Sequence, residues 1–148
     1  MNIIRTTSEN LDFQRLVEKL DAYLAMMDGK EHAFYDQYNK IAMLKNCIVI
    51  YDGIEAVACG AIKEIAPNTM EIKRMFTLPE KRRKGLASLM LKALESWSKE
   101  LGYEKVLLET GKRQVEAVAL YIKCGYQIIE NYGQYIGVEN SICFEKEL

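Results

Sequence analysis

A basic, glycine-containing turn is the part of this sequence best suited to chemistry. Cations occupy residues 81–84, Gly85 follows them, and an apolar pattern of helical period begins at Leu86. The first N–H groups of a helix have no partner within it, the helix dipole is positive there, and glycine lets a ligand approach the backbone. The turn is therefore predicted to bind a phosphorylated ligand.

Two other phosphate-binding motifs do not match this turn. A dinucleotide fingerprint needs three glycines at fixed spacing, and a P-loop ends in Gly-Lys-Ser or Gly-Lys-Thr, whereas Gly85 stands alone here. A nucleic-acid patch is disfavoured because Leu86 and Ala87 lead directly into an amphipathic helix. A solvated basic turn without a ligand remains the plain alternative.

The elements that must position this turn follow from hydrophobic periodicity. Helical spacing of apolar residues predicts helices from residue 13 to a break at 28–30, and over residues 33–44, 86–101 and 114–124. Apolar and alternating runs predict strands over residues 1–5, 47–51, 56–65, 70–77, 105–109, 126–130 and 141–145. Hairpins come first and strands later alternate with helices, which predicts an α/β mixed sheet with helices on both faces.

Length and charge limit the classes of protein and partner. A chain of 148 residues is predicted to form a single domain, residues 1–148. Its net charge of −1 predicts no nucleic-acid partner and no attraction to an anionic membrane. Because the sequence has no signal-like start and no apolar run of about 18 residues, we expect a cytoplasmic protein.

Residues that could bind a metal are sparse. His32 is the only histidine, and the four cysteines have no zinc-like or redox-like spacing. We expect no metal site, and we expect all four thiols to be reduced and structural, namely Cys47, Cys59, Cys124 and Cys143.

Two segments together resemble the GNAT superfamily of acetyl-CoA-dependent N-acetyltransferases. Arg82-x-x-Gly85-x-Ala87 is similar to its motif Q/R-x-x-G-x-G/A, and the preceding strand ends at a Leu-Pro step, as this family favours. Residues 114–126 are similar to its second signature, N-x-x-A-x-x-L-Y-x-K-x-G-F/Y. Order, spacing and context agree from about residue 55 to the C-terminus.

The resemblance implies a fold and a subgroup. It implies a single-domain GNAT fold with a mixed, mostly antiparallel sheet of about six to seven strands flanked by about four helices. Residues 131–135 and 141–146 look like a bacterial subgroup of uncertain substrate. Dimers are common in this superfamily, so a homodimer is possible here too.

The resemblance also assigns the acetyl-CoA site. It implies that the basic turn binds the pyrophosphate of CoA mainly with backbone N–H groups, through Arg82, Arg83, Lys84, Gly85, Leu86, Ala87 and Ser88. The pantetheine arm pairs like an added strand with the backbone of Met75, Phe76 and Thr77. Gln114 stands where the family usually has asparagine, and we place it with Ala117 beside the cofactor arm.

Two side chains are predicted to carry the chemistry. The family implies that Tyr121 protonates the departing thiolate, for which a phenol with a reference pKa of about 10 is suited. Packing on an amphipathic helix is the alternative for this tyrosine. Glu71 is our first choice of base and Glu109 the second. Strand alternation places Glu71 on one face with Lys73, Met75 and Thr77, so an exposed carboxylate paired with Lys73 is an equal alternative.

The acceptor is the least determined part. In the family its groove is built from the first two helices and the loop before the last strand. Here those regions hold Asp28, Glu31, His32, Tyr35, Asn39, Tyr132, Tyr135, Glu139 and Asn140. They suit a small cationic amine or an ordinary solvated loop equally.

The function predicted from these residues is direct transfer of an acetyl group from acetyl-CoA to the primary amine of a small molecule. A protein lysine or N-terminal acetyltransferase is one alternative, and a non-catalytic acyl-CoA-binding protein is the other.

Overall fold

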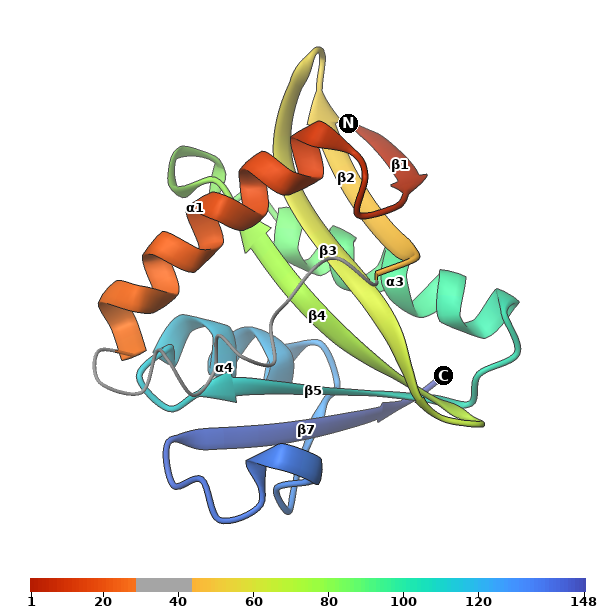
Figure 1. The fold of residues 1–148 in the computed structure, drawn as a ribbon, viewed down its shortest axis with the longest axis vertical. Coiled ribbons are helices and arrows are strands. Elements are labelled where there is room, and N and C mark those ends of the chain that lie inside the picture. The colour runs from red at the N-terminus through yellow and green to blue at the C-terminus, as the bar shows by residue number, and fades with distance from the viewer. Residues whose placement is uncertain (29–43) are drawn as a thin grey trace.

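Seven strands form one mixed sheet in this computed structural model, which describes residues 1–28 and 44–148. The order across the sheet is β1-β2-β3-β4-β5-β7-β6 (Figure 1). The strands are β1 (Asn2–Thr6), β2 (Asn46–Asp52), β3 (Glu55–Ala66), β4 (Thr69–Thr77), β5 (Lys105–Gly111), β6 (Gln127–Ile129) and β7 (Ser141–Glu147). All neighbours are antiparallel except β4 and β5. The predicted mixed, mostly antiparallel sheet is confirmed.

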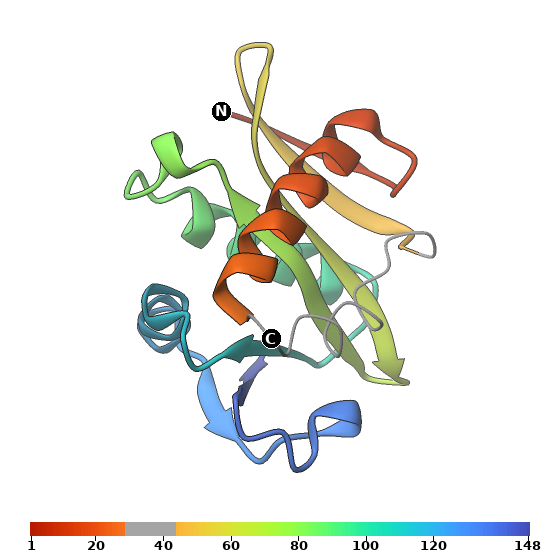
Figure 2. The ribbon, with the colours of Figure 1, turned by 60° about the vertical axis from the view of Figure 1, so that its left-hand side comes forward.

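Helices cover both faces of this sheet. Helix α1 (Leu11–Asp28) crosses one face and α3 (Leu86–Glu100) lies against the other, while α4 (Val115–Lys123) runs beside β5 (Figures 1 and 2). Two short 3-10 helices are η2 (Pro79–Lys81) and η3 (Gly133–Tyr135). The described residues thus contain three α-helices. The predicted helix over residues 33–44 falls almost wholly on residues 29–43, outside the described part.

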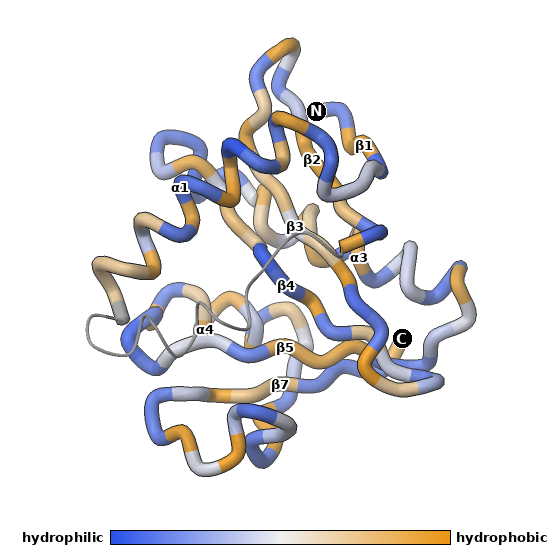
Figure 3. Tube along the Cα trace, in the orientation of Figure 1, coloured by the Kyte–Doolittle hydropathy of each residue, from blue (hydrophilic) through white to orange (hydrophobic). Residues whose placement is uncertain are grey.

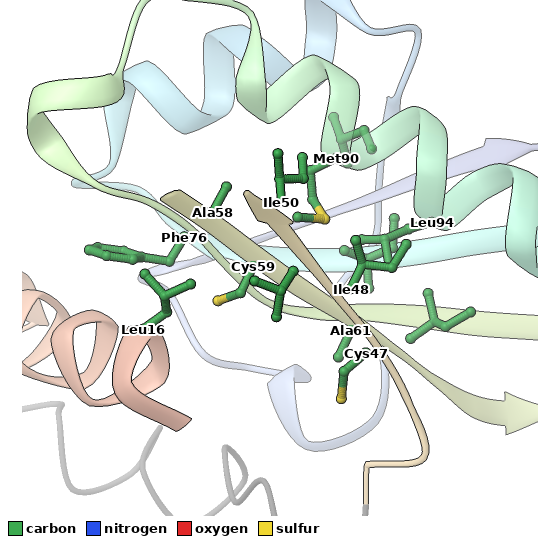
Figure 4. Close-up of a cluster of buried hydrophobic side chains, with 14 of the residues drawn as sticks. Leu16, Cys47, Ile48, Ile50, Ala58, Cys59, Ala61, Phe76, Met90 and Leu94 are labelled. Atoms are coloured by element: carbon green, nitrogen blue, oxygen red, sulfur yellow. The ribbon is translucent and has the colours of Figure 1, made fainter. Parts of the chain in front are cut away.

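The core packs helices onto the sheet from both sides (Figure 4). Met90 and Leu94 of α3 lie over Ile48 of β2, and all three are at most 1 % exposed. A Cβ at Gly60 would come within 3.0 Å of both Leu94 Cδ1 and Met90 Sδ, so glycine at this position lets α3 approach β3 closely. On the other face, Leu16 of α1 packs against the sheet.

The thiols agree with the sequence prediction, and α1 begins at a capping residue. Cys47, Cys59 and Cys143 are fully buried, and all four cysteines are free. Burial raises the pKa of Cys59 to about 12, so this thiol is an inert small apolar group. Asn10 Oδ1 accepts a hydrogen bond from the Phe13 N–H at 2.9 Å, which caps the helix. None of the helices among the described residues is both long and apolar enough to cross a bilayer.

A bulge in β4 changes which of its residues share a face. Cys59 pairs with Phe76 and Ala61 pairs with Lys73, so β4 carries one residue more than β3 between these two pairs. Arg74 lies within the bulge and has a left-handed φ of 59°. Because directly paired residues point to the same side, Phe76 and Lys73 share a face. The predicted strict alternation along β4 is therefore wrong beyond Lys73.

Strands β4 and β5 separate after a short paired stretch. Their parallel ladder joins Thr69, Met70 and Glu71 to residues 105–107 and then stops. Both strands continue past this point, and Figure 1 shows them diverging. The later half of β4 therefore has an edge that β5 leaves unpaired, next to α4 and the turn before α3.

Candidate active site

A groove of about 750 Å³ lies beside the open end of β4. Its walls are the end of β4, the turn before α3, one side of α4 and part of α1. Eleven of the twelve residues predicted to bind the CoA donor line it, namely Met75, Phe76, Thr77, Arg82, Arg83, Gly85, Leu86, Ala87, Ser88, Gln114 and Ala117. Lys84 is exposed and lies outside the lining. The structure thus brings both sequence signatures to one groove.

The turn before α3 has the backbone shape of an anion site. Gly85 is the N-cap of α3 with φ 79°, and Arg83 is left-handed at φ 65°. No side chain caps this helix, so the first-turn N–H groups remain available to a ligand. A Cβ at Gly85 would meet nothing within 4 Å, so glycine is favoured there by its positive φ and not by crowding.

Arg82 braces the end of β4. Its Nε donates to the Thr77 carbonyl oxygen at 3.1 Å, and its guanidinium lies over the rings of Tyr23 and Phe76, 5.2 and 5.6 Å from their centroids. This cation–π contact holds the turn against α1. Arg82 therefore positions the groove as well as adding charge to it.

The other cations of the turn have different partners. Lys81 Nζ lies 3.5 Å from Asp52 and 3.5 Å from Glu55, on the hairpin between β2 and β3. Arg83 lies 3.5 Å from Glu116 of α4, and both side chains are more than four-fifths exposed. An exposed pair of this kind is weak, so Arg83 can exchange this partner for a phosphate at little cost.

A second, smaller cavity of about 100 Å³ adjoins the groove. Four residues line both spaces: Leu20, Met75, Gln114 and Tyr121. Among the described residues, the rest of its lining comes mainly from β4 and β5, with Leu24 of α1 and Tyr135 of η3. The shared residues mark the place where a ligand in the groove would meet a ligand in the small cavity.

Tyr121 stands at this junction and is held by aromatic packing. Its ring lies 6.0 Å from that of Tyr126 and 5.5 Å from that of Phe144, centroid to centroid. Burial raises the pKa of Tyr121 to about 12, and the nearby negative charge of Glu109 contributes in the same direction. The phenol is therefore a hydrogen-bond donor throughout the neutral range. Tyr121 is both packed and placed at the junction.

Glu71 is buried in the small cavity within a polar network. Its side chain is 6 % exposed, its Oε1 lies 3.4 Å from Lys73 Nζ, and its Oε2 accepts a hydrogen bond from the Tyr132 hydroxyl at 2.5 Å. The pairing with Lys73 that the alternative interpretation named is present, but the exposure that this interpretation required is not. Glu71 is buried because β4 is an interior strand covered by α1 and by the loop before β7.

Glu109 reaches the same cavity from β5. Its Oε2 accepts a hydrogen bond from Ser141 Oγ at 2.6 Å. The charges of Glu109 and Glu71, together with burial, raise the pKa of Tyr135, which lines the cavity beside them. Both candidate bases, Glu71 and Glu109, therefore line one small cavity. They are far apart in the sequence, so the sequence alone does not show that they are neighbours.

The predicted acceptor residues are only partly described. Tyr135 lines the small cavity and Tyr132 binds Glu71. Glu139 is exposed, and the Asn140 carbonyl oxygen accepts the Lys112 N–H at 2.7 Å. Asp28 ends α1, and its side chain lies outside the described part, as do Glu31, His32, Tyr35 and Asn39.

The sequence analysis missed several residues of the two cavities. Lys73 and Arg74 line the small cavity, and Arg113 lines the groove just before α4. Two adjacent cations in a strand of otherwise apolar character, visible in the middle of β4 in Figure 3, were the available signal. Among the described residues, no group of three or more His, Cys, Asp or Glu side chains could hold a metal ion.

Comparison with known proteins identifies similar chains. The model of the Acetyltransferase (GNAT) family matches residues 13–126. The chain is 35 % identical to the uncharacterized N-acetyltransferase YsnE of Bacillus subtilis over 100 residues, which span 66 % of each chain. A structure from Klebsiella pneumoniae, assigned as an acyl-CoA N-acyltransferase, is 28 % identical with a TM-score of 0.84, over 99 % of this chain and 97 % of that one.

A further neighbour was solved with a ligand. The GNAT family acetyltransferase of Elizabethkingia anophelis, with acetyl-CoA bound, has a TM-score of 0.73 at 20 % identity, over 99 % of this chain and 97 % of that one. At this identity the likeness concerns the fold.

Proposed function

The chain belongs to the acetyltransferase (GNAT) family, and from this premise we propose that it transfers the acetyl group of acetyl-CoA directly to the primary amine of a small molecule. The observation that carries the proposal is the junction of the two cavities at Met75, Gln114 and Tyr121. A donor in the groove and an acceptor in the small cavity would meet there. No cysteine lines either space among the described residues, which supports direct transfer without an acyl-enzyme.

The groove has the parts that CoA needs. The uncapped N-terminus of α3, with Gly85 and Arg83 in left-handed conformations, offers N–H groups to the pyrophosphate. The open edge of β4 at Met75 to Thr77 offers backbone groups to the pantetheine arm. Gln114 and Ala117 face this arm from α4.

Tyr121 acts as the general acid in this proposal. The amine nitrogen forms a bond to the acetyl carbonyl carbon, the C–S bond breaks, and the sulfur takes its proton from Tyr121. The raised pKa of Tyr121, about 12, keeps the phenol protonated and ready at neutral pH. Its hydroxyl also stabilises the departing thiolate by hydrogen bonding before the proton moves.

Glu71 acts as the base, through water. It takes one proton from the ammonium form of the acceptor, and the nitrogen loses a second proton after the C–N bond forms. Over a cycle one of these protons restores Tyr121, and the other leaves to solvent. Glu109 is the second candidate, because it faces the same cavity and acts electrostatically on Tyr121.

The small cavity has a volume of about 100 Å³, which is room for the amine end of a compact acceptor. A protein lysine or N-terminal acceptor and a binding protein without turnover are the two rival functions, and both are separated from the proposal by a single assay.

That assay is release of free CoA thiol from acetyl-CoA, measured over a panel of small amines and lysine peptides. We expect turnover with small amines, and we expect Tyr121→Phe to lower kcat by about a hundred-fold. Phenylalanine keeps the ring contacts with Tyr126 and Phe144, so the fold is expected to survive. Thiol release with peptides alone would establish the protein acceptor, and CoA binding without release would establish the non-catalytic function.

Tyr126→Phe is the matched control. It removes the hydroxyl that donates to Glu95 at 2.7 Å, but this tyrosine lines neither cavity. We expect lower stability and an unchanged kcat. Equal kcat in Tyr121→Phe and the wild-type protein would remove Tyr121 from the mechanism.

A further inference from the structure

The small cavity holds more charge than acetyl transfer to a simple amine requires. Its described lining includes two carboxylates, Glu71 and Glu109, and two cations, Lys73 and Arg74. Carboxylates alone would suit a cationic amine, whereas cations in the same space oppose it. Each cation has a carboxylate partner, Lys73 with Glu71 and Arg74 with Asp21, so their remaining hydrogen-bond donors are what would match an anionic group on the acceptor.

Arg74 lines this cavity and has a buried hydrogen-bond donor without a partner. Its side chain is 1 % exposed, and its Nη2 donates to Asp21 Oδ1 of α1. Its Nε is the one buried side-chain nitrogen or oxygen among the described residues without a hydrogen-bond partner. Such groups are rare in folded proteins because a buried N–H without an acceptor is unfavourable. An oxygen of a bound ligand would satisfy it.

Lys73 adds a second donor at the same wall. Its side chain is 6 % exposed, and its Nζ lies 3.4 Å from Glu71 Oε1. This distance exceeds the roughly 2.8 Å of a close charge-assisted hydrogen bond, so the pair is loose enough to admit a ligand oxygen.

The β4 bulge falls at these two cations. Consecutive residues of a regular strand point to opposite faces. Here Arg74 adopts a left-handed φ of 59°, and both Lys73 and Arg74 line the cavity. A positive φ at a residue other than glycine is strained, and such strain persists where a function or the surroundings require it.

We infer that the acceptor is a compact zwitterion of the amino-acid class, whose carboxylate accepts the Nε–H of Arg74 beside Lys73 while its amine faces the junction at Tyr121. This inference rests on the function proposed above. The carboxylate takes no part in the bond changes and serves to bind and orient the acceptor.

The test compares acceptors that differ only at the carboxylate. The wild-type protein is assayed with acetyl-CoA and three matched series: alanine, alaninamide and ethylamine; leucine, leucinamide and isoamylamine; phenylalanine, phenylalaninamide and phenethylamine. We expect kcat/KM for the acid to exceed that of the plain amine by about ten-fold to a hundred-fold in at least one series. The amide separates recognition of a charged carboxylate from recognition of a neutral carbonyl.

Each outcome decides the inference. Plain amines that react as well as the acids would overturn it and leave the proposed function intact. Amides that react as well as the acids would replace the carboxylate by a neutral carbonyl. Absence of acetyl transfer to any of these amines, and to polyamines and lysine peptides, would overturn the proposed function and this inference with it.

Two variants locate the effect. Arg74→Gln should bring the acid-to-amine ratio of kcat/KM close to one, because kcat/KM falls much further for the acids than for the plain amines. Asp21→Asn removes the negative charge beside Arg74 but keeps an oxygen acceptor and the Arg74 Nε, so we expect it to lower stability and preserve the ratio. A ratio that stays high in folded Arg74→Gln, or that falls equally in both variants, would contradict the assignment of Arg74.

Discussion

The donor groove and the acceptor cavity share one wall and differ in what they are made of. The groove is lined by backbone groups at the end of β4 and at the start of α3. Its other walls come from the turn before α3 and from α4. The cavity uses buried charged side chains of β4 and β5, held by residues distant in sequence, such as Tyr132 with Glu71 and Ser141 with Glu109. The first offers mainly main-chain donors, and the second is lined by charged side chains.

This difference has an energetic consequence. Backbone N–H groups persist whatever side chain is attached, so most single substitutions in the groove should weaken donor binding by modest factors. Buried charges depend on their partners, and removal of one leaves another uncompensated in a low-dielectric space. We therefore expect substitutions in the cavity to have larger effects than substitutions in the groove.

The largest expected effect concerns Glu71. Glu71→Gln keeps the shape of the side chain and removes the base, so we expect kcat at neutral pH to fall by about a hundred-fold. The deficit should shrink as the assay pH approaches the pKa of the acceptor amine, because a neutral amine no longer needs a base. A pH–rate profile with a fixed acceptor measures both. If Glu109→Gln shows this pH-dependent deficit and Glu71→Gln does not, their roles are exchanged.

Glu95 offers the matched structural control. It is partly buried, binds Lys146 Nζ at 3.0 Å and the Tyr126 hydroxyl, and lines neither cavity. Glu95→Gln should lower the free energy of unfolding without the pH-dependent loss of kcat. An equal kinetic deficit in this variant would show that loss of a buried carboxylate acts through stability alone.

A smaller effect is expected at the turn of the donor groove. Gly85→Ala places a Cβ in open space but at φ 79°, which costs about 1 kcal/mol of conformational energy. We expect the turn to relax and the KM for acetyl-CoA to rise several-fold, with the KM for the acceptor unchanged. Steady-state kinetics with each substrate varied in turn measures the two constants.

Gly53 provides the comparison for that change. It has φ 63° and open space around its Cβ position, and it lies on the hairpin between β2 and β3. Gly53→Ala should lose similar stability and keep the KM for acetyl-CoA. A rise in this KM for both variants would mean that the turn acts only through global stability.

The smallest effect concerns how Tyr121, one of the four residues common to both regions, makes stability depend on pH. The pKa of Tyr121 is raised to about 12, against 10 for an ordinary tyrosine. Between pH 10 and 12 the unfolded chain loses this proton while the folded chain keeps it, so the free energy of unfolding falls as pH rises. Across this window we expect wild type to lose on the order of 2 kcal/mol more than Tyr121→Phe. Urea unfolding at several pH values measures the difference, and parallel curves would contradict the raised pKa.

The order and kind of elements could be predicted because their signals are local. Periodicity placed the long strands and the helices of residues 86–100 and 115–123 to within a residue or two. Eleven of the twelve residues predicted for the donor site line the groove, because backbone geometry at Gly85 and helical spacing at Gln114, Ala117 and Tyr121 are properties of short segments.

The cavity could not be predicted in the same way. The bulge at Arg74 depends on how β4 pairs with β3, and no short segment shows it. The burial of Glu71 depends on α1 and on the loop that carries Tyr132, so an interior carboxylate looked like an exposed one.

The sequence alone therefore determined the family, the sheet and helices, and most of the residues that we propose to bind the donor, because each follows from spacing within one segment. The tertiary structure decided which charged residues line the small cavity, because Glu109 of β5 joins Glu71, Lys73 and Arg74 only through the packing of β4 and β5. The shape of the turn before α3 follows from the residues of that turn, whereas the grouping of the buried charged residues follows from the packing of strands that are distant in the sequence.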